Sequence, residues 1–255
     1  MQVEYRKEMA LPAVYLDRTC HLGLYQSGLL LQDTLTELFH QYECDAIRMS
    51  RSHGAVWAVA RTKFRFLKRP FWLDPIVVRA YPVKVTPAAV HVEMAVETPE
   101  GQPLLYAKQE VCALDMEGHS LRRIDATPFP RDLPLPPSAL SASYRRMKFQ
   151  LEEETFRRVI RATDTDMNGH MNNAASLRLA EDAFSSGYWA AHPVTELDLH
   201  YAGEGMEGQT LSVRREETED GAAVQLKDGD RTVLRAFFRT ETAKEDCIPE
   251  GNPVH

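Results

Sequence analysis

Apolar residues recur at helical spacing in both halves of the chain. In the first half, steps of three and four residues link the apolar positions Leu31, Leu35, Leu38, Phe39, Tyr42 and Ala46, a pattern typical of an amphipathic helix. A second helix is predicted over roughly 173–190, a segment rich in alanine and serine. Because small side chains let a sheet approach a helix closely, we expect strands to wrap this helix.

Runs with strand character precede and follow each predicted helix. The first half has an extended run at 14–20 and predicted strands at 56–66, 76–81, 90–96 and 104–114. The second half has a strand at 155–162 and further strands at 194–201, 210–215, 222–227 and 232–240. Glycine turns at Glu100-Gly101 and Asp228-Gly229 occupy matching places. The same order of elements, a strand, a helix and four strands, is predicted in both halves, which indicates an internal repeat.

The repeat divides the chain into two units of one α+β architecture. Residues 126–150 begin with a stretch that contains five prolines between Ala126 and Ser138, which predicts an extended linker. We therefore expect an N-terminal unit at 1–125, this linker, a C-terminal unit at 151–243 and a loose tail at 244–255. The two antiparallel sheets are expected to join into one, which would protect their edges.

The strongest chemical signal lies between the second-half strand and its helix. Asp166, Asn168 and His170 fall at alternate positions there, and Asn172 and Asn173 follow. A single polar side chain is enough to cap a helix, so five such residues exceed that structural need. Helix-start N–H groups bind anions or polarised carbonyl oxygens. A general base, an orienting carboxylate and an oxyanion site are therefore predicted together.

Three segments resemble the fatty acyl-ACP thioesterases of plants and bacteria. The stretch from Asp166 to Asn173 resembles the Asp-x-Asn-x-His-x-Asn-Asn signature of that family, and Arg69–Asp74 and Leu199–Glu204 resemble two further family motifs. The resemblance implies two tandem hotdog folds, each a long helix wrapped by an antiparallel β-sheet. It also implies hydrolysis of fatty acyl-ACP without a cofactor, with Asp166, Asn168, His170 and Glu204 as catalytic residues. Substrate contacts are expected from Asn172, Asn173, Gly203 and Gly205.

The residues themselves leave two candidates for the general base. Histidine side chains have an unperturbed pKa of about 6.5, which makes His170 one candidate, while Glu204 lies between two glycines that permit close approach. Plant members carry cysteine after this glutamate, whereas this chain has Gly205, so a covalent cysteine mechanism is excluded at that site. The first-half junction, taken from His21 onward, lacks the motif, which predicts one active site per chain.

The composition of the chain argues against several classes of binding partner. The 255 residues carry a formal net charge of −7, which argues against nucleic-acid binding. No apolar run is long enough to cross a bilayer, and no signal-like segment opens the sequence. The four cysteines (Cys20, Cys44, Cys112 and Cys247) lack metal-ligand spacing and are expected to be reduced. Three of them, Cys20, Cys44 and Cys112, are predicted to be core residues. A cytoplasmic enzyme without a metal is predicted, and a homodimer is left open.

Acyl carrier protein is acidic, so its docking requires a basic patch. The stretch with Arg61, Lys63, Arg65, Lys68 and Arg69 is the first candidate, and Arg145, Arg146 and Lys148 form the second. Three other functions remain as alternatives: an acyl-CoA thioesterase on the same fold, a hotdog dehydratase or hydratase, and a non-catalytic acyl-binding module. The sequence does not predict acyl chain length, saturation or branching.

Overall fold

In the computed structural model, which describes residues 2–118, 120–140 and 143–241, eleven strands form one antiparallel sheet. The first-half strands are β1 (Tyr5–Ala10), β2 (Ala55–Phe66), β3 (Pro75–Val85), β4 (Val90–Glu97), β5 (Pro103–Asp115) and β6 (Leu121–Arg122). The second-half strands are β7 (Glu154–Val159), β8 (Val194–Tyr201), β9 (Thr210–Thr218), β10 (Gly221–Asp228) and β11 (Arg231–Thr240). The strand order is β1-β3-β4-β5-β2-β8-β11-β10-β9-β7, with β6 paired to β5.

The two halves join in the middle of this sheet. Strands β2 and β8 pair antiparallel there, with Arg61 opposite His200 and Arg65 opposite Glu196. One strand of each half thereby protects the edge of the other, as the sequence predicted. The double hotdog architecture is confirmed.

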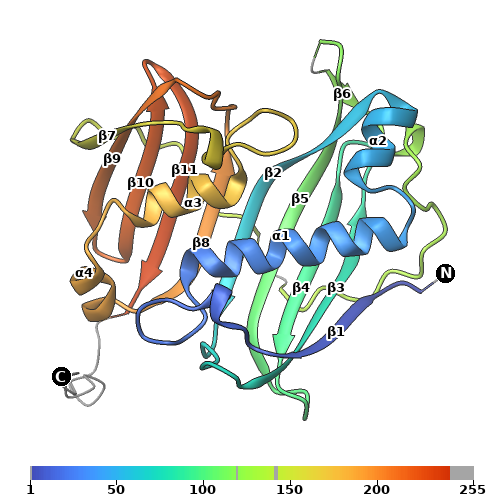
Figure 1. Cartoon of the computed structure of the whole chain (residues 1–255), viewed down its shortest axis with the longest axis horizontal. Coiled ribbons are helices and arrows are strands. Elements are labelled where there is room, and N and C mark those ends of the chain that lie inside the picture. The colour runs from blue at the N-terminus through green and yellow to red at the C-terminus, as the bar shows by residue number, and fades with distance from the viewer. Residues whose placement is uncertain (1, 119, 141–142, 242–255) are drawn as a thin grey trace.

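The long helices α1 (Leu24–Gln41) and α3 (Asn173–Glu181) lie on the same face of the sheet, one following the other along the molecule (Figure 1). A single buried cluster holds side chains from both helices and from the sheet, including Leu31, Phe64, Leu177 and Leu199. The shorter helices are α2 (Ala46–His53) and α4 (Ser186–Ala191), and the 3-10 turns are η1 (Ala13–Tyr15), η2 (Ile124–Ala126) and η3 (Ala162–Asp164).

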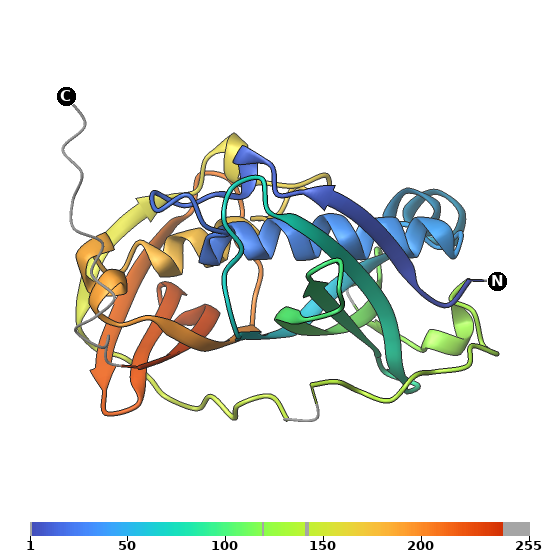
Figure 2. The ribbon, with the colours of Figure 1, turned by 90° about the horizontal axis from the view of Figure 1, so that it is seen from below.

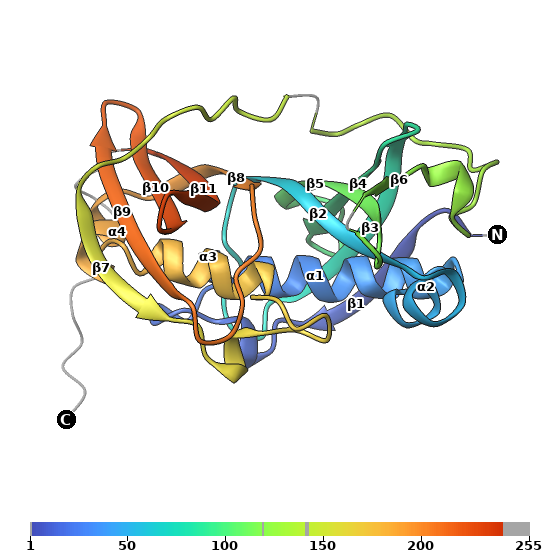
Figure 3. The same cartoon turned by 90° about the horizontal axis from the view of Figure 1, so that it is seen from above.

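The proline-rich segment crosses the opposite face of the sheet as an extended chain (Figures 2 and 3). Buried polar side chains of the strands hold it there. The Glu93 carboxylate accepts from the Ala139 N–H at 2.8 Å, Asp198 accepts from the Arg145 N–H at 2.9 Å, and Gln225 accepts from the Leu151 N–H at 2.9 Å. The extended path expected for this segment is observed.

Two first-half elements differ from their predictions. The first strand is Tyr5–Ala10 instead of 14–20, which forms η1 and a turn. Strand β1 is an edge strand with four of its six residues exposed, so it lacks the alternation that marks a half-buried strand. The first helix ends at Gln41, before Glu43 at φ +58°, and α2 then begins as a separate helix.

The second predicted helix is interrupted after Glu181. Ser185 adopts an extended conformation and caps α4 by accepting from the Tyr188 N–H at 3.1 Å. A run of small residues therefore does not form one continuous helix here. The tail predicted at 244–255 lies outside the described residues.

Candidate active site

The polar motif before α3 folds into a tight turn that presents His170. The Asp166 carboxylate accepts from the Asn168 N–H at 2.8 Å, and the Asp166 N–H donates to the His170 carbonyl at 2.9 Å. Gly169 completes the turn at φ +78°, a left-handed conformation that glycine adopts without strain. The spacing of Asp166, Asn168 and His170 at every second position is therefore explained by the turn as well as by a candidate site.

Glu204 reaches this turn because the chain after β8 is hydrogen-bonded to it. The Met171 N–H donates to the Gly205 carbonyl at 2.7 Å, and His170 forms a β-bridge with Met206. A Cβ atom on Gly205 would lie 2.6 Å from Ile160 Cδ1, so this close approach favours glycine. Packing therefore explains Gly205 without any contact to a substrate.

His170 and Glu204 lie side by side as a result. The His170 Nδ1 atom is 3.5 Å from Glu204 Oε1, and the side chains are 25% and 46% exposed. This separation is an ion-pair distance and exceeds the usual N–H···O hydrogen-bond length of about 2.7–3.2 Å. Catalytic hydrogen bonds are often long before substrate binds and tighten in the reacting complex. The geometry therefore suits a proton-transfer pair that water can reach.

Asp166 and Asn168 lie in the same turn, but the Asp166 carboxylate is bound to loop backbone. Asn168 is exposed. The structure thus brings His170 and Glu204 together, and it gives Asp166 a role in shaping the turn. A direct part for Asp166 and Asn168 in the reaction stays a prediction.

The start of α3 supplies backbone donors. Asn172 is the N-cap, and its Oδ1 accepts from the Ala174 N–H at 2.8 Å. This cap occupies one donor of the first turn and leaves the N–H groups of Asn173 and Ala175 as the remaining candidates for an oxyanion. Asn172 thus acts as the cap, while the Asn173 side chain lines a pocket.

Asp164 anchors the turn, and the sequence did not single it out. Its side chain is 1% exposed and accepts from Arg158 Nη2 at 3.1 Å, from Arg178 Nη2 and from the Arg161 N–H at 3.0 Å. Its carbonyl accepts from the Asn172 N–H at 2.8 Å. Asp164 therefore ties the end of β7 to α3. The only feature of the sequence that could have indicated Asp164 is its position as a further carboxylate two residues before Asp166.

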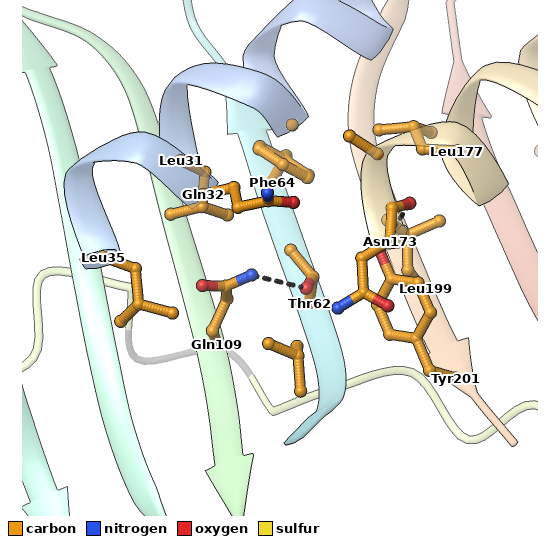
Figure 4. Close-up of a pocket in the computed structure, with 13 residues that line it drawn as sticks. Leu31, Gln32, Leu35, Thr62, Phe64, Gln109, Asn173, Leu177, Leu199 and Tyr201 are labelled. Carbon is orange, nitrogen blue, oxygen red and sulfur yellow. Dashed lines mark hydrogen bonds between the residues drawn. The ribbon is translucent and has the colours of Figure 1, made fainter. Parts of the chain in front are cut away.

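A pocket adjoins this turn, between α1, α3 and strands β2, β5 and β8 (Figure 4). Asn173 and Tyr201 line it, three residues along the chain from His170 and Glu204 respectively. The cavity has a volume of about 30 Å³, enough for a group the size of a water molecule. Its other walls include leucines and Gln32 of the helices, with Thr62 and Gln109 on the sheet (Figure 4).

Three charged residues of β2 face away from this pocket. Side chains alternate along a strand, and Thr62 and Phe64 line the pocket. The intervening residues Arg61, Lys63 and Arg65 therefore point to the face crossed by the linker. A carrier docked on that face would be separated from the pocket by the sheet. A part of these three residues in docking the carrier stays a prediction, and their position on the face opposite the pocket does not favour it.

Burial removes Lys63 from the surface altogether. Its side chain is 5% exposed and lies 3.0 Å from a Glu196 oxygen and 2.9 Å from an Asp198 oxygen. Arg69, next in the candidate patch, binds the Asp17 carboxylate. Lys68 alone of the patch is both exposed and outside this sheet face.

The turn before α1 repeats the hydrogen bonds of the turn that presents His170. The Asp17 N–H donates to the His21 carbonyl at 2.8 Å, as the Asp166 N–H does to the His170 carbonyl at 2.9 Å. His21 forms a β-bridge with the loop after β2, as His170 does with the loop after β8. The equivalent segment thus begins at Asp17 and not at His21, where the sequence comparison placed it.

The first-half turn differs in its chemistry. Thr19 occupies the position that Asn168 has in the second-half turn. One residue of the loop after β2 accepts the hydrogen bond that Gly205 accepts in the second half, and Arg69 comes directly before that residue. Arg69 therefore occupies the place of Glu204, and it neutralises the Asp17 carboxylate. The carboxylate–histidine pair of the second half has no counterpart in this turn.

The cysteines vary in burial. Cys44 is buried and Cys112 is half-buried, whereas Cys20 is exposed, which corrects its assignment to the core. Within the part of the chain that the structure describes, no cluster of three or more His, Cys, Asp or Glu side chains is arranged to hold a metal. None of the described helices is long and apolar enough to span a membrane.

Known proteins show the same architecture. Residues 148–235, which include His170 and Glu204, match the family model of the acyl-ACP thioesterase C-terminal domain. The chain is similar in fold to an acyl-ACP thioesterase from Bacteroides thetaiotaomicron, with 16% identity and a TM-score of 0.80 over 93% of this chain and 98% of that one. It is also similar to the 12:0-ACP thioesterase from Umbellularia californica, with 14% identity and a TM-score of 0.81 over 95% and 99%. No curated protein matches the sequence.

These comparisons bear on different parts of the chain. The structural likenesses give the fold of the whole chain, and the family match gives the identity of the second half. Residues 148–235 thus match the acyl-ACP thioesterase C-terminal domain, and the whole chain has the fold of acyl-ACP thioesterases, in agreement with the resemblance drawn from the sequence.

Proposed function

We propose that this enzyme releases free fatty acid from acyl-ACP and that His170 and Glu204 together activate the attacking water. The observation that carries the proposal is the 3.5 Å separation between His170 Nδ1 and Glu204 Oε1. These two side chains come from separate loops, and both lie within the stretch that matches the thioesterase domain.

The geometry favours different roles for His170 and Glu204. Glu204 faces Nδ1, so it holds a proton on that nitrogen and leaves Nε2 of His170 to act as the base. Water loses its proton to Nε2 as its oxygen attacks the thioester carbonyl. The carbonyl oxygen gains negative charge and is stabilised by N–H groups at the start of α3, including that of Asn173. The carbon–sulfur bond then breaks, and the thiolate takes the proton from His170.

The pocket beside Asn173 and Tyr201 supports the placement of the acyl chain. It leads from the α3 turn toward β2, β5 and α1 of the first half. Its present volume of about 30 Å³ holds only a group the size of a water molecule, so binding of an acyl chain requires the surrounding side chains to move. The first half thus shapes the acyl site, while the second half supplies the chemistry.

One site per chain follows from the first-half turn. Arg69 lies where the reaction needs a carboxylate, and it is already paired with Asp17. The free thiols of Cys44 and Cys112 support a reducing compartment such as the cytoplasm.

A thiol-release screen tests this function. ACP-borne and CoA-borne thioesters of increasing acyl length are supplied at equal concentration, and free thiol is measured with time. The proposal expects thiol release with a preference for the ACP-borne donor. Preference for CoA esters would support an acyl-CoA thioesterase, and loss of water from a hydroxyacyl donor without thiol release would support a dehydratase.

A further inference from the structure

One wall of the pocket carries a polar group in an apolar row. Along β5, the side chains that face the helices belong to Leu105, Ala107, Gln109, Val111 and Ala113, and all are buried. Gln109 is the polar member of this row and is 6% exposed. Its amide points into the pocket opposite Leu35 of α1 (Figure 4).

Only the nitrogen of the Gln109 side-chain amide has a hydrogen-bond partner among the described residues. Gln109 Nε2 donates to Thr62 Oγ1 at 3.3 Å, whereas Gln109 Oε1 is buried without a hydrogen-bond partner among the described residues. Leaving a buried acceptor unpaired lowers stability, and an apolar side chain of similar shape would avoid that cost. The unmet acceptor therefore points to a ligand group that donates a hydrogen bond.

The position of the pocket indicates where that donor lies on the substrate. Asn173, whose backbone N–H is proposed to bind the thioester carbonyl, lines the same pocket as Gln109, so we place the part of the acyl chain next to the thioester beside Gln109. A hydroxyl both donates and accepts, and it fits a cavity of about 30 Å³. An unsubstituted methylene chain would cover the Gln109 oxygen without satisfying it.

We infer that the preferred acyl chain carries a hydroxyl close to the thioester, which donates to Gln109 Oε1. This inference rests on the proposed function and specifies its substrate class. Discrimination follows from the unmet acceptor, because a site built to bind a hydroxyl rejects the analogue that lacks it more strongly than it rejects a change of chain length.

Matched thioesters provide the test. Purified enzyme is given 3-hydroxyacyl-ACP and the unsubstituted acyl-ACP of the same length, and kcat/KM is measured by thiol release. The wild type should favour the hydroxylated donor by about tenfold or more. Gln109→Leu should reduce this ratio to about twofold or less, chiefly by improving the hydrolysis of the unsubstituted donor.

A second lining variant serves as the control. Leu35→Met changes the shape of the same pocket without adding or removing a hydrogen-bonding group. It should alter the rates of both donors together and keep their ratio. Circular dichroism of each variant verifies folding, and the wild-type ratio remains informative if Gln109→Leu does not fold.

Several outcomes would overturn the inference while leaving the proposed function intact. Equal kcat/KM for the two donors in the wild type would show that water, and not substrate, satisfies Gln109. A ratio that survives Gln109→Leu would place hydroxyl recognition elsewhere. Absence of thiol release from every donor would instead refute the proposed function itself.

Discussion

At the scale of single residues, the sequence predicted which side chains of the candidate site lie together better than it predicted the residues that support them. His170 and Glu204 could be found because they stand out as polar groups in motifs. Asp164 and Gln109 were missed, since their importance comes from burial and from partners that only the folded chain brings close. Lys63 was misjudged for the same reason, because its partners Glu196 and Asp198 lie on a strand of the other half.

Asp164 gives a prediction at this scale. Asp164→Asn removes the negative charge that Arg158 and Arg178 share, and it weakens the link between β7 and α3. We expect the free energy of unfolding to fall by about 1–3 kcal/mol and kcat to fall with the displaced turn. Urea denaturation measures the first effect. Asp230→Asn, at an exposed hairpin position, is the matched control, and an equal loss in both variants would contradict the anchoring role.

At the scale of elements, the strands were predicted more closely than the helices. Strand β8 was predicted within its observed bounds, because alternating side chains mark a half-buried strand clearly. The second helix was predicted as one element, and its interruption at Ser185 depends on a cap that competes locally with helix continuation. The start of α1 was predicted too late, because Gly23 provides no side-chain cap.

A carboxylate from the other half replaces that missing cap. Glu181 at the end of α3 accepts from the Tyr25 N–H in the first turn of α1 at 2.9 Å. Burial raises the pKa of Glu181 to about 7, with the hydrogen bond from Tyr25 opposing this shift. The contact therefore links the two helices and makes their association sensitive to pH.

The folded state holds the Glu181 proton to a higher pH than the unfolded chain, whose glutamate has a pKa of about 4.3. Stability is therefore lost as pH rises from about 4.3 toward the folded pKa of about 7. Glu181→Gln keeps an acceptor for Tyr25 and should flatten the melting temperature across this range. An exposed control, Glu207→Gln, should retain the wild-type slope, and a slope that persists in Glu181→Gln would disprove the assignment.

At the scale of the whole molecule, the repeat in the sequence was enough to predict two joined units on one sheet. The repeat did not show on which face of the sheet the charged side chains of each strand lie, because that depends on where both helices pack. Nor did it reveal that Asp17 and Arg69 lie in a first-half turn that corresponds to the turn presenting His170. That equivalence appears only in the paired backbone hydrogen bonds of the two turns.

Carrier docking is testable at this scale with two residues of equal charge. Lys68→Glu should raise the KM for acyl-ACP several-fold at low salt and leave acyl-CoA hydrolysis nearly unchanged, because docking of an acidic carrier is electrostatic. The effect should shrink at high salt as the charges are screened. Arg65→Glu, on the linker face of the sheet, should change neither KM. Equal effects of the two substitutions would refute a docking role specific to Lys68.

His170 and Glu204 are proposed to act as one unit, and a double-mutant cycle tests whether they do. His170→Gln and Glu204→Gln are prepared singly and together, and kcat is measured by thiol release from acyl-ACP. Each single change should lower kcat by about 10²–10⁴-fold. The double variant should be scarcely slower than the more impaired single variant, because residues that act together lose their function together. Losses that multiply in the double variant, or near-full activity of either single variant, would contradict the account.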